Sequence, residues 1–358
     1  MAIYVILFLC SCLIALFLTP VLRKTAVRNG FLDYPDERKM HKNAVPRVGG
    51  IAITISFFIS IILGYVFFRS RLDESVVISL TGLSIGGLIV VILGLFDDLW
   101  GVNAWKKIVV QGVAALMLMP FGFAIRELNL PFLGVINMGW GFGIPFTVFW
   151  IVGIVNTINF VDGIDGLAAG ISVVISSVLF MVAIVTGQLL MALVCLVLAG
   201  STLGFLRHNF HPASIFMGDC GAMFLGFILA AVSIKVLFQN LSITASSMAP
   251  VLIFGLPIVD ATWAIVRRLG RRIPPFRADG LHIHHRLITL GLTQRQAVAI
   301  LYLVSSLSSA AGLAIALTSS EKSAVVVSAS MLAIALIGTA VLGRAVPFEP
   351  TKTQTDSA

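Results

Sequence analysis

Eleven stretches of about 20 mostly apolar residues run through this sequence and constrain its fold more than any other feature. A helix of about 20 apolar residues is long enough to cross the roughly 30 Å of hydrocarbon in a bilayer, and it satisfies its own backbone hydrogen bonds there. The pattern therefore predicts an all-α, polytopic integral membrane protein with about eleven transmembrane helices. The predicted spans lie near residues 2–22, 49–68, 75–95, 107–125, 142–158, 167–186, 189–206, 220–238, 246–266, 296–317 and 322–343.

The composition excludes the main classes of soluble protein. Hydrophobic residues make up 58% of the chain and charged residues only 11%, with a mean hydropathy of +1.04. Soluble domains carry roughly a quarter charged residues, so a soluble enzyme, a secreted disulfide scaffold and a disordered regulator are all excluded. The four cysteines show no CxxC or zinc-binding spacing. We interpret the net charge of +8 as a record of topology and expect no nucleic-acid partner.

The positions of the basic residues predict the orientation of the chain. The first span has no Lys or Arg before it and Arg23, Lys24 and Arg28 after it, the reverse of a cleavable signal peptide. We therefore expect the N-terminus outside and, after an odd number of spans, the C-terminus in the cytoplasm. Nineteen of the 24 Lys and Arg residues then fall in cytoplasmic segments, as the positive-inside rule requires. The stretch 126–145, which is interrupted by Pro and Gly, could form an external re-entrant or interfacial piece.

This topology predicts one transmembrane domain over residues 1–343 and a polar tail over 344–358, which we expect to be disordered. The polar loops on the predicted cytoplasmic side hold most of the unusual side chains. These loops are residues 23–48, 97–107, 156–166, 207–219 and 267–295.

Carboxylate and amide side chains gather in these loops, whereas the external loops are short and mostly bland. These carboxylate and amide side chains follow the third and fifth predicted spans and precede the eighth. The residues concerned are Asp97 and Asp98, then Asn159, Asp162 and Asp165 in NTINFVDGIDG, and Asp219 in FMGDCG.

These carboxylates have a structural and a functional interpretation. Asp162 or Asp219 could cap the start of a helix. Asp97 and Asp98 could be a solvated pair, although adjacent like charges raise one pKa unless a cation is present. A divalent cation removes this difficulty, and carboxylate and amide oxygens suit Mg²⁺ or Mn²⁺ better than zinc. Because Mg²⁺ usually completes its shell with water and substrate phosphates, the pattern indicates phosphoryl chemistry.

Basic residues in the same loops could neutralise a diphosphate substrate. Lys106, Lys107, Arg271 and Arg272 are the candidates, and Arg suits bidentate phosphate contact. For most basic residues of these loops, orienting the chain in the membrane is the alternative explanation.

Three histidines and one intramembrane carboxylate add to this set. His282, His284 and His285 show no zinc-finger spacing, so we favour contact with phosphate or sugar over metal ligation. Asp260 lies inside a predicted span, which makes it a functional candidate. It could equally serve to position the basic loop that follows.

Five motifs in one order carry a resemblance to a known family. They are PDERKMHKNAVPRVGG (35–50), GLFDDLWG (94–101), NTINFVDGIDGLAAG (156–170), FMGDCG (216–221) and HIHH (282–285). Together they resemble the polyprenyl-phosphate N-acetylhexosamine-1-phosphate transferases over nearly the whole chain. The resemblance implies a multi-pass enzyme of the bacterial cytoplasmic membrane with its active site on the cytoplasmic face. Such an enzyme transfers a sugar-1-phosphate from a UDP-sugar to undecaprenyl phosphate with Mg²⁺ or Mn²⁺.

The resemblance also implies roles for individual residues. Asp97 and Asp98 match paired catalytic aspartates that deprotonate the lipid phosphate or organise the metal. Asp219 matches the metal-binding aspartate, with Asn159 beside the same metal. Transfer in one step and transfer through an aspartyl-phosphate both remain open. Substrate contacts are implied for Asp162, Gly163, Asp165 and Phe216 around the nucleoside, for Lys107 and Arg272 at the diphosphate, and for His282, His284 and His285.

The HIHH run is similar to the branch that uses UDP-N-acetylglucosamine to start teichoic acid, O-antigen or related glycans. The peptidoglycan branch, which uses UDP-N-acetylmuramoyl-pentapeptide, carries three consecutive histidines and is the alternative. An ion-coupled transporter is the alternative from another class. It predicts mid-span ionisable residues and symmetry between halves, whereas Asp97, Asp98, Asp162 and Asp219 fall at the edges of cytoplasmic loops and no symmetry is evident. A homodimer is plausible by resemblance only.

Overall fold

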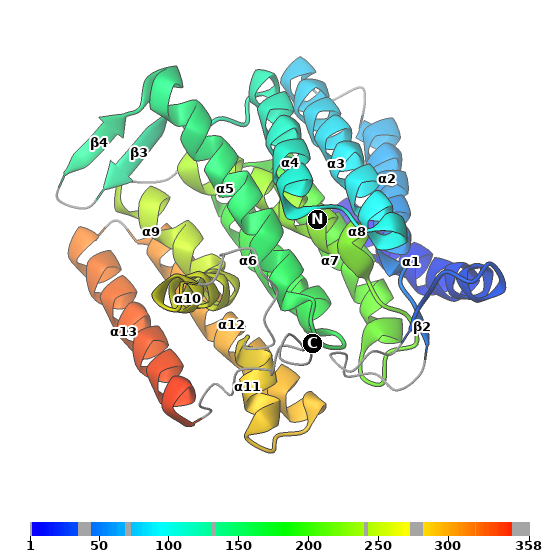
Figure 1. Ribbon diagram of the computed structural model, residues 1–358. Coiled ribbons are helices and arrows are strands. Elements are labelled where there is room, and N and C mark those ends of the chain that lie inside the picture. The colour runs from blue at the N-terminus through cyan, green and yellow to red at the C-terminus, as the bar shows by residue number, and fades with distance from the viewer. Residues whose placement is uncertain are drawn as a thin grey trace.

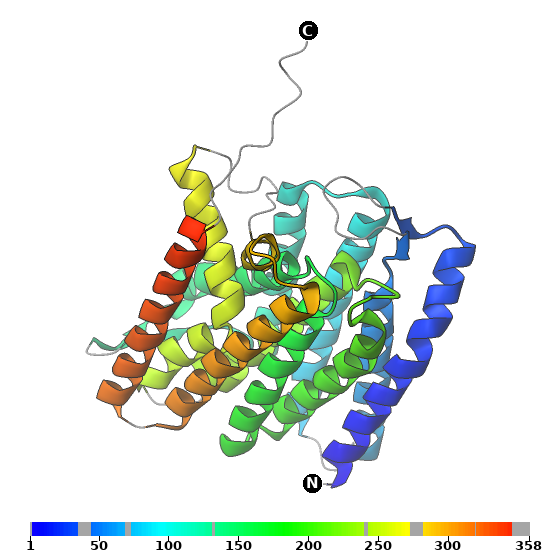
Figure 2. The same ribbon diagram turned by 90° about the horizontal axis from the view of Figure 1, so that it is seen from below.

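The computed structural model describes residues 2–34, 44–68, 73–130, 133–239, 243–272, 282–318 and 320–345 of the 358-residue chain. Long helices form a bundle in which α1 and α13 lie on opposite flanks (Figures 1 and 2). The long helices are α1 (Ala2–Arg28), α2 (Gly49–Phe68), α3 (Glu74–Trp100), α4 (Ala104–Leu118), α5 (Gly139–Val161), α6 (Leu167–Val185), α7 (Leu189–Asn209), α8 (Gly218–Ser233), α12 (Gln294–Leu317) and α13 (Glu321–Ala345).

Shorter elements connect these helices. Two antiparallel strand pairs stand between α1 and α2 and between α4 and α5. A 3₁₀ turn follows α4, a π-helix continues α8, and three further helices precede α12. Their bounds are β1 (Leu32–Asp33), β2 (Val45–Pro46), η2 (Met119–Phe121), β3 (Glu127–Leu130), β4 (Gly134–Asn137), η3 (Ile234–Phe238), α9 (Ile243–Ile253), α10 (Gly255–Gly270) and α11 (Ile283–Thr289).

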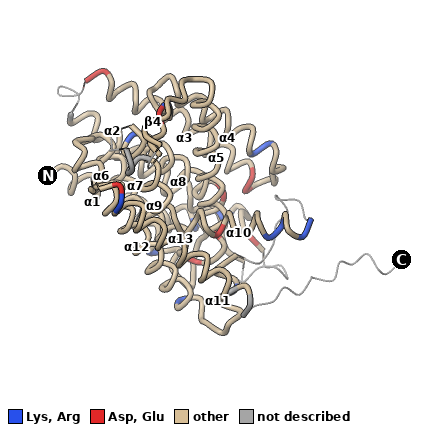
Figure 3. The backbone as a smooth tube through the Cα atoms, turned by 90° about the vertical axis from the view of Figure 1, so that its left-hand side faces the viewer, with Lys and Arg blue, Asp and Glu red and all other residues tan. Residues whose placement is uncertain are grey.

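The prediction of a polytopic helical membrane protein is confirmed. Ten helices in the described part of the chain are long and apolar enough to cross a membrane, or eleven if α9 and α10 form one broken span. Figure 3 shows long stretches of tube without charged residues. In the most apolar stretch of α8, 94% of the residues are buried, compared with 22% in α1 and 11% in α13. Thus α8 is the central helix of the bundle.

The predicted span 246–266 is wrong as a single straight helix. The chain breaks at Phe254, and the helices on either side meet at 85°, so that α10 is seen nearly end-on in Figure 1. Two prolines, Pro250 and Pro257, flank the break, and a proline removes one helical hydrogen bond. A Cβ at Gly255 would lie 2.2 Å from Ser308 Oγ, so α12 packs directly against the bend.

Two further expectations need correction. The all-α prediction omitted both strand pairs. The interrupted stretch 126–145 contains the β3–β4 hairpin, after which α5 begins at Gly139. At the other end of the chain, α13 reaches Ala345, past the predicted start of the tail. Residues 346–358, which make up most of the predicted disordered tail, lie outside the described residues.

Glycines let two helices approach the first turn of α8. A Cβ at Gly94 of α3 would lie 2.4 Å from Cys220 Cα, and a Cβ at Gly50 of α2 would lie 2.2 Å from Gly221 N. Contacts this short leave no room for any side chain. Backbone therefore packs on backbone here, and the end of α3 is brought to the start of α8.

We predict that Gly94→Ala lowers stability by about 1–3 kcal/mol, because the added methyl group forces α3 away from α8. Gly112→Ala on α4 is the matched control, since its Cβ would meet only Val148 at 3.8 Å. Thermal unfolding of the detergent-solubilised protein checks this. Equal unfolding midpoints for the two variants would contradict the packing described above.

Candidate active site

Three of the predicted carboxylates meet where α3 ends and α8 begins. Asp97 and Asp98 lie in the last turn of α3, and Asp219 is the second residue of α8. The side chain of Asp98 is only 3% exposed and that of Asp219 is 11% exposed. A buried carboxylate is costly unless it is paired or hydrogen-bonded, so the partners of these groups define the site.

Asp98 caps helix α8 from outside that helix. Its Oδ1 accepts a hydrogen bond from Asp219 N at 2.9 Å, and its Oδ2 accepts one from Cys220 N at 3.0 Å. The first amides of a helix lack partners within the helix and carry partial positive charge. Gly218 makes this approach possible, because it has φ +74° and its Cβ would lie 2.6 Å from Asp98 Oδ2. The capping considered for Asp219 is thus provided by Asp98.

Two cations hold the Asp219 carboxylate, one on each oxygen. Lys107 Nζ forms ion pairs with Asp97 Oδ2 and, at 2.9 Å, with Asp219 Oδ2. Arg47 reaches Asp98 Oδ1 through Nε at 3.1 Å and Asp219 Oδ1 through Nη2 at 2.6 Å. Consecutive residues of α3 therefore each bring one cation to the same carboxylate.

The pairing of Asp97 continues into the backbone. Its Oδ1 accepts a hydrogen bond from Val102 N at 2.7 Å, in the turn that leads into α4. The start of α4 is fixed by Asn103, whose side chain accepts from Trp105 N at 3.1 Å, as a helix N-cap does. This turn sets Lys107, near the start of α4, beside Asp97.

The end of α5 contributes amide and carboxylate groups. Asn156 Nδ2 donates to Gln111 Oε1 at 2.7 Å, which ties α5 to α4. Within the described part of the chain, the side chains of Asn159 and Asp162 form no hydrogen bond or ion pair. Burial raises the pKa of Asp162 to about 7, partly offset by Arg47. Since the same pKa is also raised by Asp219 and other carboxylates, Asp162 belongs to the same electrostatic cluster.

Asp165 has contacts of a different kind. Its Oδ2 lies 2.7 Å from His211 Nδ1 and accepts a hydrogen bond from Ala213 N at 3.0 Å. Asn209 supports the same connection by accepting from Gly166 N at 3.1 Å. These bonds tie Asp165 to the loop between α7 and α8. They indicate a role in holding that loop, and the nucleoside contact that the resemblance implies for Asp165 stays a prediction.

The three histidines pack together at the start of α11. His282 Nδ1 lies 2.8 Å from Asp260 Oδ2, and Asp260 Oδ1 accepts from Ile283 N at 2.9 Å. His284 stacks against His282 with ring centroids 5.7 Å apart, and its ring lies 4.2 Å from that of His285. Of the two roles considered for Asp260, these contacts support positioning of the loop.

His284 joins this cluster to the end of α5. A Cβ at Gly163 would lie 2.3 Å from His284 Nε2, so only glycine fits there. His284 is buried, and its Nε2 has no hydrogen-bond partner among the described residues. Burial lowers the pKa of His284 to about 3, with His285 adding to the effect and Asp260 opposing it. The histidine run thus lies beside the NTINFVDGIDG motif, although over 100 residues separate them.

Two residues that the resemblance assigns to substrate contacts have no clear role in the cluster described above. The sequence analysis also missed one residue of that cluster. Arg272 lies at the exposed end of α10 with φ 57°, next to residues outside the described part of the chain. Phe216 is half-buried and donates its backbone N–H to Pro46 O at 2.8 Å. The missed residue is Arg47, which follows Pro46 in the quoted PRVGG sequence. A charged residue between proline and two glycines was the available signal.

The donor set fits a hard divalent cation only in part. Both Asp98 oxygens already accept backbone N–H groups, and whether Asp97 or Asp98 helps to organise a metal stays a prediction. The Asp219 carboxylate and the Asn159 amide oxygen are the hard oxygen donors that Mg²⁺ prefers. The cations of Arg47 and Lys107 already lie on Asp219. Among the described residues, no group of three His, Cys, Asp or Glu side chains is arranged to hold a metal.

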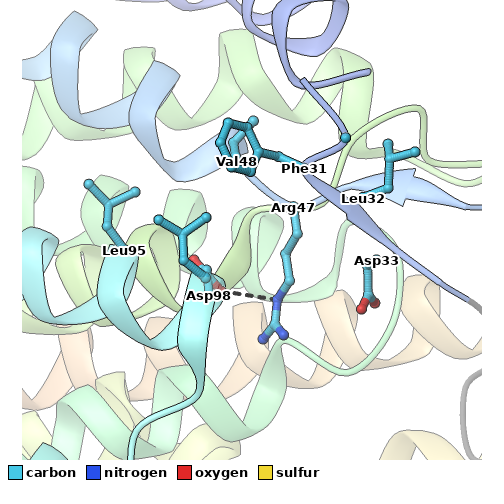
Figure 4. Close-up of a pocket in the computed structure, with 9 residues that line it drawn as sticks. Phe31, Leu32, Asp33, Arg47, Val48, Leu95 and Asp98 are labelled. Atoms are coloured by element: carbon cyan, nitrogen blue, oxygen red, sulfur yellow. Dashed lines mark ion pairs between the residues drawn. The ribbon is translucent and has the colours of Figure 1, made fainter. Parts of the chain in front are cut away.

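One pocket borders this cluster. Arg47 and Asp98 form its charged part, and Phe31, Leu95 and Leu99 are among its apolar walls. Figure 4 shows the Arg47 guanidinium between Asp98 and Asp33. The pocket lies between the connection from α1 to α2 and the last turns of α3.

The comparisons with known proteins converge on one family. Residues 80–237 match the model of glycosyl transferase family 4. A probable undecaprenyl-phosphate N-acetylglucosaminyl 1-phosphate transferase of Bacillus subtilis is 38% identical over 84% of this chain and 81% of its own length. The decaprenyl-phosphate N-acetylglucosaminephosphotransferase of Mycobacterium tuberculosis is 35% identical over 82% and 78%. The undecaprenyl-phosphate alpha-N-acetylglucosaminyl 1-phosphate transferase of Escherichia coli is 29% identical over 84% and 82%.

Because His284 is buried, we predict that the stability of the protein depends on pH. Its folded-state pKa, about 3, lies below its ordinary value of 6.5, so the folded protein resists protonation that the unfolded chain accepts. The stability that the neutral His284 imidazole contributes is fully present above pH 6.5, and it is lost as the pH falls from 6.5 towards 3. At pH 5 the loss amounts to roughly 2 kcal/mol. We expect His284→Asn to weaken this dependence.

The measurement is the thermal unfolding midpoint at pH 7.5 and pH 5 for the wild type and the variant. Removing His284 takes away one group that must stay neutral, so the decrease should be larger in the wild type. An equal decrease in both proteins would contradict the buried neutral imidazole.

Proposed function

Because the chain belongs to glycosyl transferase family 4, the family of the polyprenyl-phosphate N-acetylhexosamine-1-phosphate transferases, we propose that it transfers N-acetylglucosamine-1-phosphate from UDP-N-acetylglucosamine to undecaprenyl phosphate. The products are undecaprenyl-diphosphate-N-acetylglucosamine and UMP. This is the initiating step of a cell-envelope glycan such as teichoic acid or O-antigen. The observation that carries the proposal is the buried Asp219 carboxylate, held between Lys107 and Arg47 at the start of the central helix.

The bond changes balance without any further reactant. An oxygen of the lipid phosphate attacks the β-phosphorus of the UDP-sugar, and the bond from that phosphorus to the bridging oxygen breaks. The electron pair leaves with UMP. Positioning and neutralisation of charge supply most of the rate enhancement in phosphoryl transfer.

The charge balance of the site supports a requirement for a divalent cation. With Asp97, Asp98 and Asp219 ionised, the cluster carries one more negative charge than Arg47 and Lys107 offset. Two phosphate-bearing substrates add further negative charge. Asp219 and Asn159 would hold Mg²⁺ or Mn²⁺, and the bound cation would neutralise charge on the diphosphate and on the leaving UMP.

Lys107 is the residue that we assign to the diphosphate. It is half-buried, at 21% exposure, and its ammonium group already lies at Asp219. A lysine is a compact charge on a flexible stem, so it can turn from the carboxylate to a phosphate at the same place. Arg272 stays a weaker candidate for the same contact, because it lies at the exposed end of α10.

The paired aspartates are better suited to positioning than to direct chemistry. Asp98 is 3% exposed and bonded on both oxygens, so it cannot readily act as a nucleophile. The Asp97 oxygens are held by Lys107 and Val102 N. A phosphate monoester has its second pKa near 6 and is mostly dianionic at neutral pH, so little base catalysis is needed. These contacts favour direct, one-step transfer over an aspartyl-phosphate.

The donor nucleotide is assigned to the end of α5. The side-chain polar atoms of Asn159 and Asp162 form no hydrogen bond or ion pair with the described residues, and the exposed Gly163 offers close backbone approach. The histidines beside Gly163 are placed to contact the sugar or its phosphate. The names of these three relatives specify N-acetylglucosamine, which favours this donor over the pentapeptide nucleotide.

The same arrangement supports a proposal for the side of the membrane on which the site lies. The end of α3, the start of α4, the end of α5 and the start of α8 meet at the cluster, so the proposed site lies at one end of the bundle. Described residues of the two segments richest in Lys and Arg, 23–48 and 267–295, lie at the same end. Pro46 O accepts a hydrogen bond from Phe216 N, and His284 packs against Gly163. The positive-inside rule supports a cytoplasmic face for it.

We predict metal-dependent release of UMP by the purified protein from UDP-N-acetylglucosamine and undecaprenyl phosphate. Asp219→Asn should reduce turnover by about 10³-fold or more, because it removes the charge on which both cations and the metal converge. Asp73→Asn, at the exposed opposite end of α3 with no side-chain cap bond, is the matched control. We expect it to retain wild-type activity.

UDP-N-acetylmuramoyl-pentapeptide in a parallel reaction tests the donor. UMP from this nucleotide alone would keep the chemistry and contradict the N-acetylglucosamine assignment. Absence of UMP from both donors, with a folded protein and Mg²⁺ present, would contradict the proposed reaction. Full activity of Asp219→Asn would contradict the proposed site.

A further inference from the structure

We propose that Arg47 is a positioning residue for the transfer reaction, which fixes the Asp219 carboxylate by bridging it to Asp98. The inference rests on the proposed function and assigns a further residue to the same site. Arg47 lies outside residues 80–237, the part of the chain that matches the family model. Its assignment therefore depends on the geometry of this chain.

The backbone places Arg47 beside the start of α8. Phe216 N donates to Pro46 O at 2.8 Å, and Gly49 N donates to Phe216 O at 2.9 Å. Hydrogen bonds thus join the residues on both sides of Arg47 to the segment that leads into Asp219. Because these short segments are tied together, Arg47 and Asp219 keep a fixed spacing.

The side chain of Arg47 connects Asp98, whose two oxygens both accept backbone hydrogen bonds, to Asp219, the proposed metal ligand. Asp98 is held by the Asp219 and Cys220 amides, so its position is set by the first turn of α8. Arg47 donates from Nε to this fixed carboxylate and from Nη2 to Asp219 Oδ1. A planar guanidinium presents donors in a rigid fork, so these two contacts define the direction in which Asp219 Oδ1 faces.

The two cations of the site have different freedom. Lys107 reaches Asp97 and Asp219 through one ammonium nitrogen at the end of a flexible stem. Arg47 uses two different nitrogens, and its backbone is anchored next to Asp219. We therefore assign Lys107 to the substrate diphosphate and Arg47 to the orientation of Asp219 throughout turnover.

A direct contact to substrate is the competing role for Arg47. Its side chain is 40% exposed and lines the pocket with apolar walls shown in Figure 4. A phosphate attached to a lipid could in principle enter there. That role would appear in the KM for undecaprenyl phosphate, whereas positioning of Asp219 appears in kcat.

The test compares Arg47→Ala, Arg47→Lys and the control Arg28→Ala in the UMP-release assay. Arg28 lies exposed at the end of α1. We expect Arg47→Ala to lower kcat by about 10- to 100-fold, the usual effect of losing a partner that orients an active-site ligand. KM for both substrates should stay within about threefold. Arg47→Lys should recover part of kcat, millimolar guanidinium should partly rescue Arg47→Ala, and Arg28→Ala should match the wild type.

Three outcomes would overturn the inference. They are an unchanged kcat in Arg47→Ala, a rise confined to KM for undecaprenyl phosphate, or a lowered unfolding midpoint without rescue by guanidinium or lysine. The last would show that Arg47 serves folding alone.

Hydrogen–deuterium exchange supplies a readout that needs no turnover. In Arg47→Ala the peptide containing Asp219 and Cys220 should exchange faster, while peptides from the rest of α8 exchange as in the wild type. A wild type that releases no UMP would count against the proposed function alone. The exchange comparison would still decide whether Arg47 fixes the start of α8, and unchanged exchange at that peptide would overturn the inference.

Discussion

The rest of the site depends on how one buried carboxylate is neutralised. Asp219 lies at the start of the most deeply buried helix, where an unpaired charge would cost several kcal/mol. Lys107 and Arg47 neutralise it from two sides, and consecutive aspartates at the end of α3 hold these cations in place. The double aspartate of the GLFDDLWG motif is thereby explained, because each residue serves a different cation.

Helix packing makes this charge arrangement possible. Gly94 and Gly50 let α3 and α2 reach the backbone of α8, and Gly218 leaves room for the Asp98 carboxylate. The glycines and aspartates of the motifs therefore act together. A glycine opens the approach, and the neighbouring carboxylate then satisfies the exposed helix amides. A similar arrangement recurs where Gly163 admits His284 and Asp260 binds His282 and the first turn of α11.

Much of the fold could be predicted from the sequence, because long apolar stretches in a bilayer leave few alternatives to helices. The failures have local causes. The 246–266 span looked continuous in hydropathy, and only Pro250, Gly255 and Pro257 hinted at the break. The β3–β4 hairpin is too short for its alternation to stand out beside the surrounding glycines and prolines.

The site was only partly predictable for a different reason. Residue type and spacing identified Asp97, Asp98 and Asp219 as a group, but they gave no information on which oxygen faces which partner. The sequence therefore left open whether Asp97 or Asp98 organises the metal, and it did not reveal that the Asp98 oxygens cap α8. Arg47 was missed because its importance depends on backbone pairing between segments about 170 residues apart.

A double-mutant cycle tests most directly the claim that Asp98 and Arg47 act through the same Asp219 carboxylate. The measurement is kcat for Asp98→Asn, Arg47→Ala and the double variant. Strong coupling is expected, with the double variant no more than about threefold slower than the slower single variant. For single losses in kcat of about 10-fold or more, the interaction energy is then about 0.7 kcal/mol or more. Independent effects, in which the two losses in kcat multiply, would contradict it.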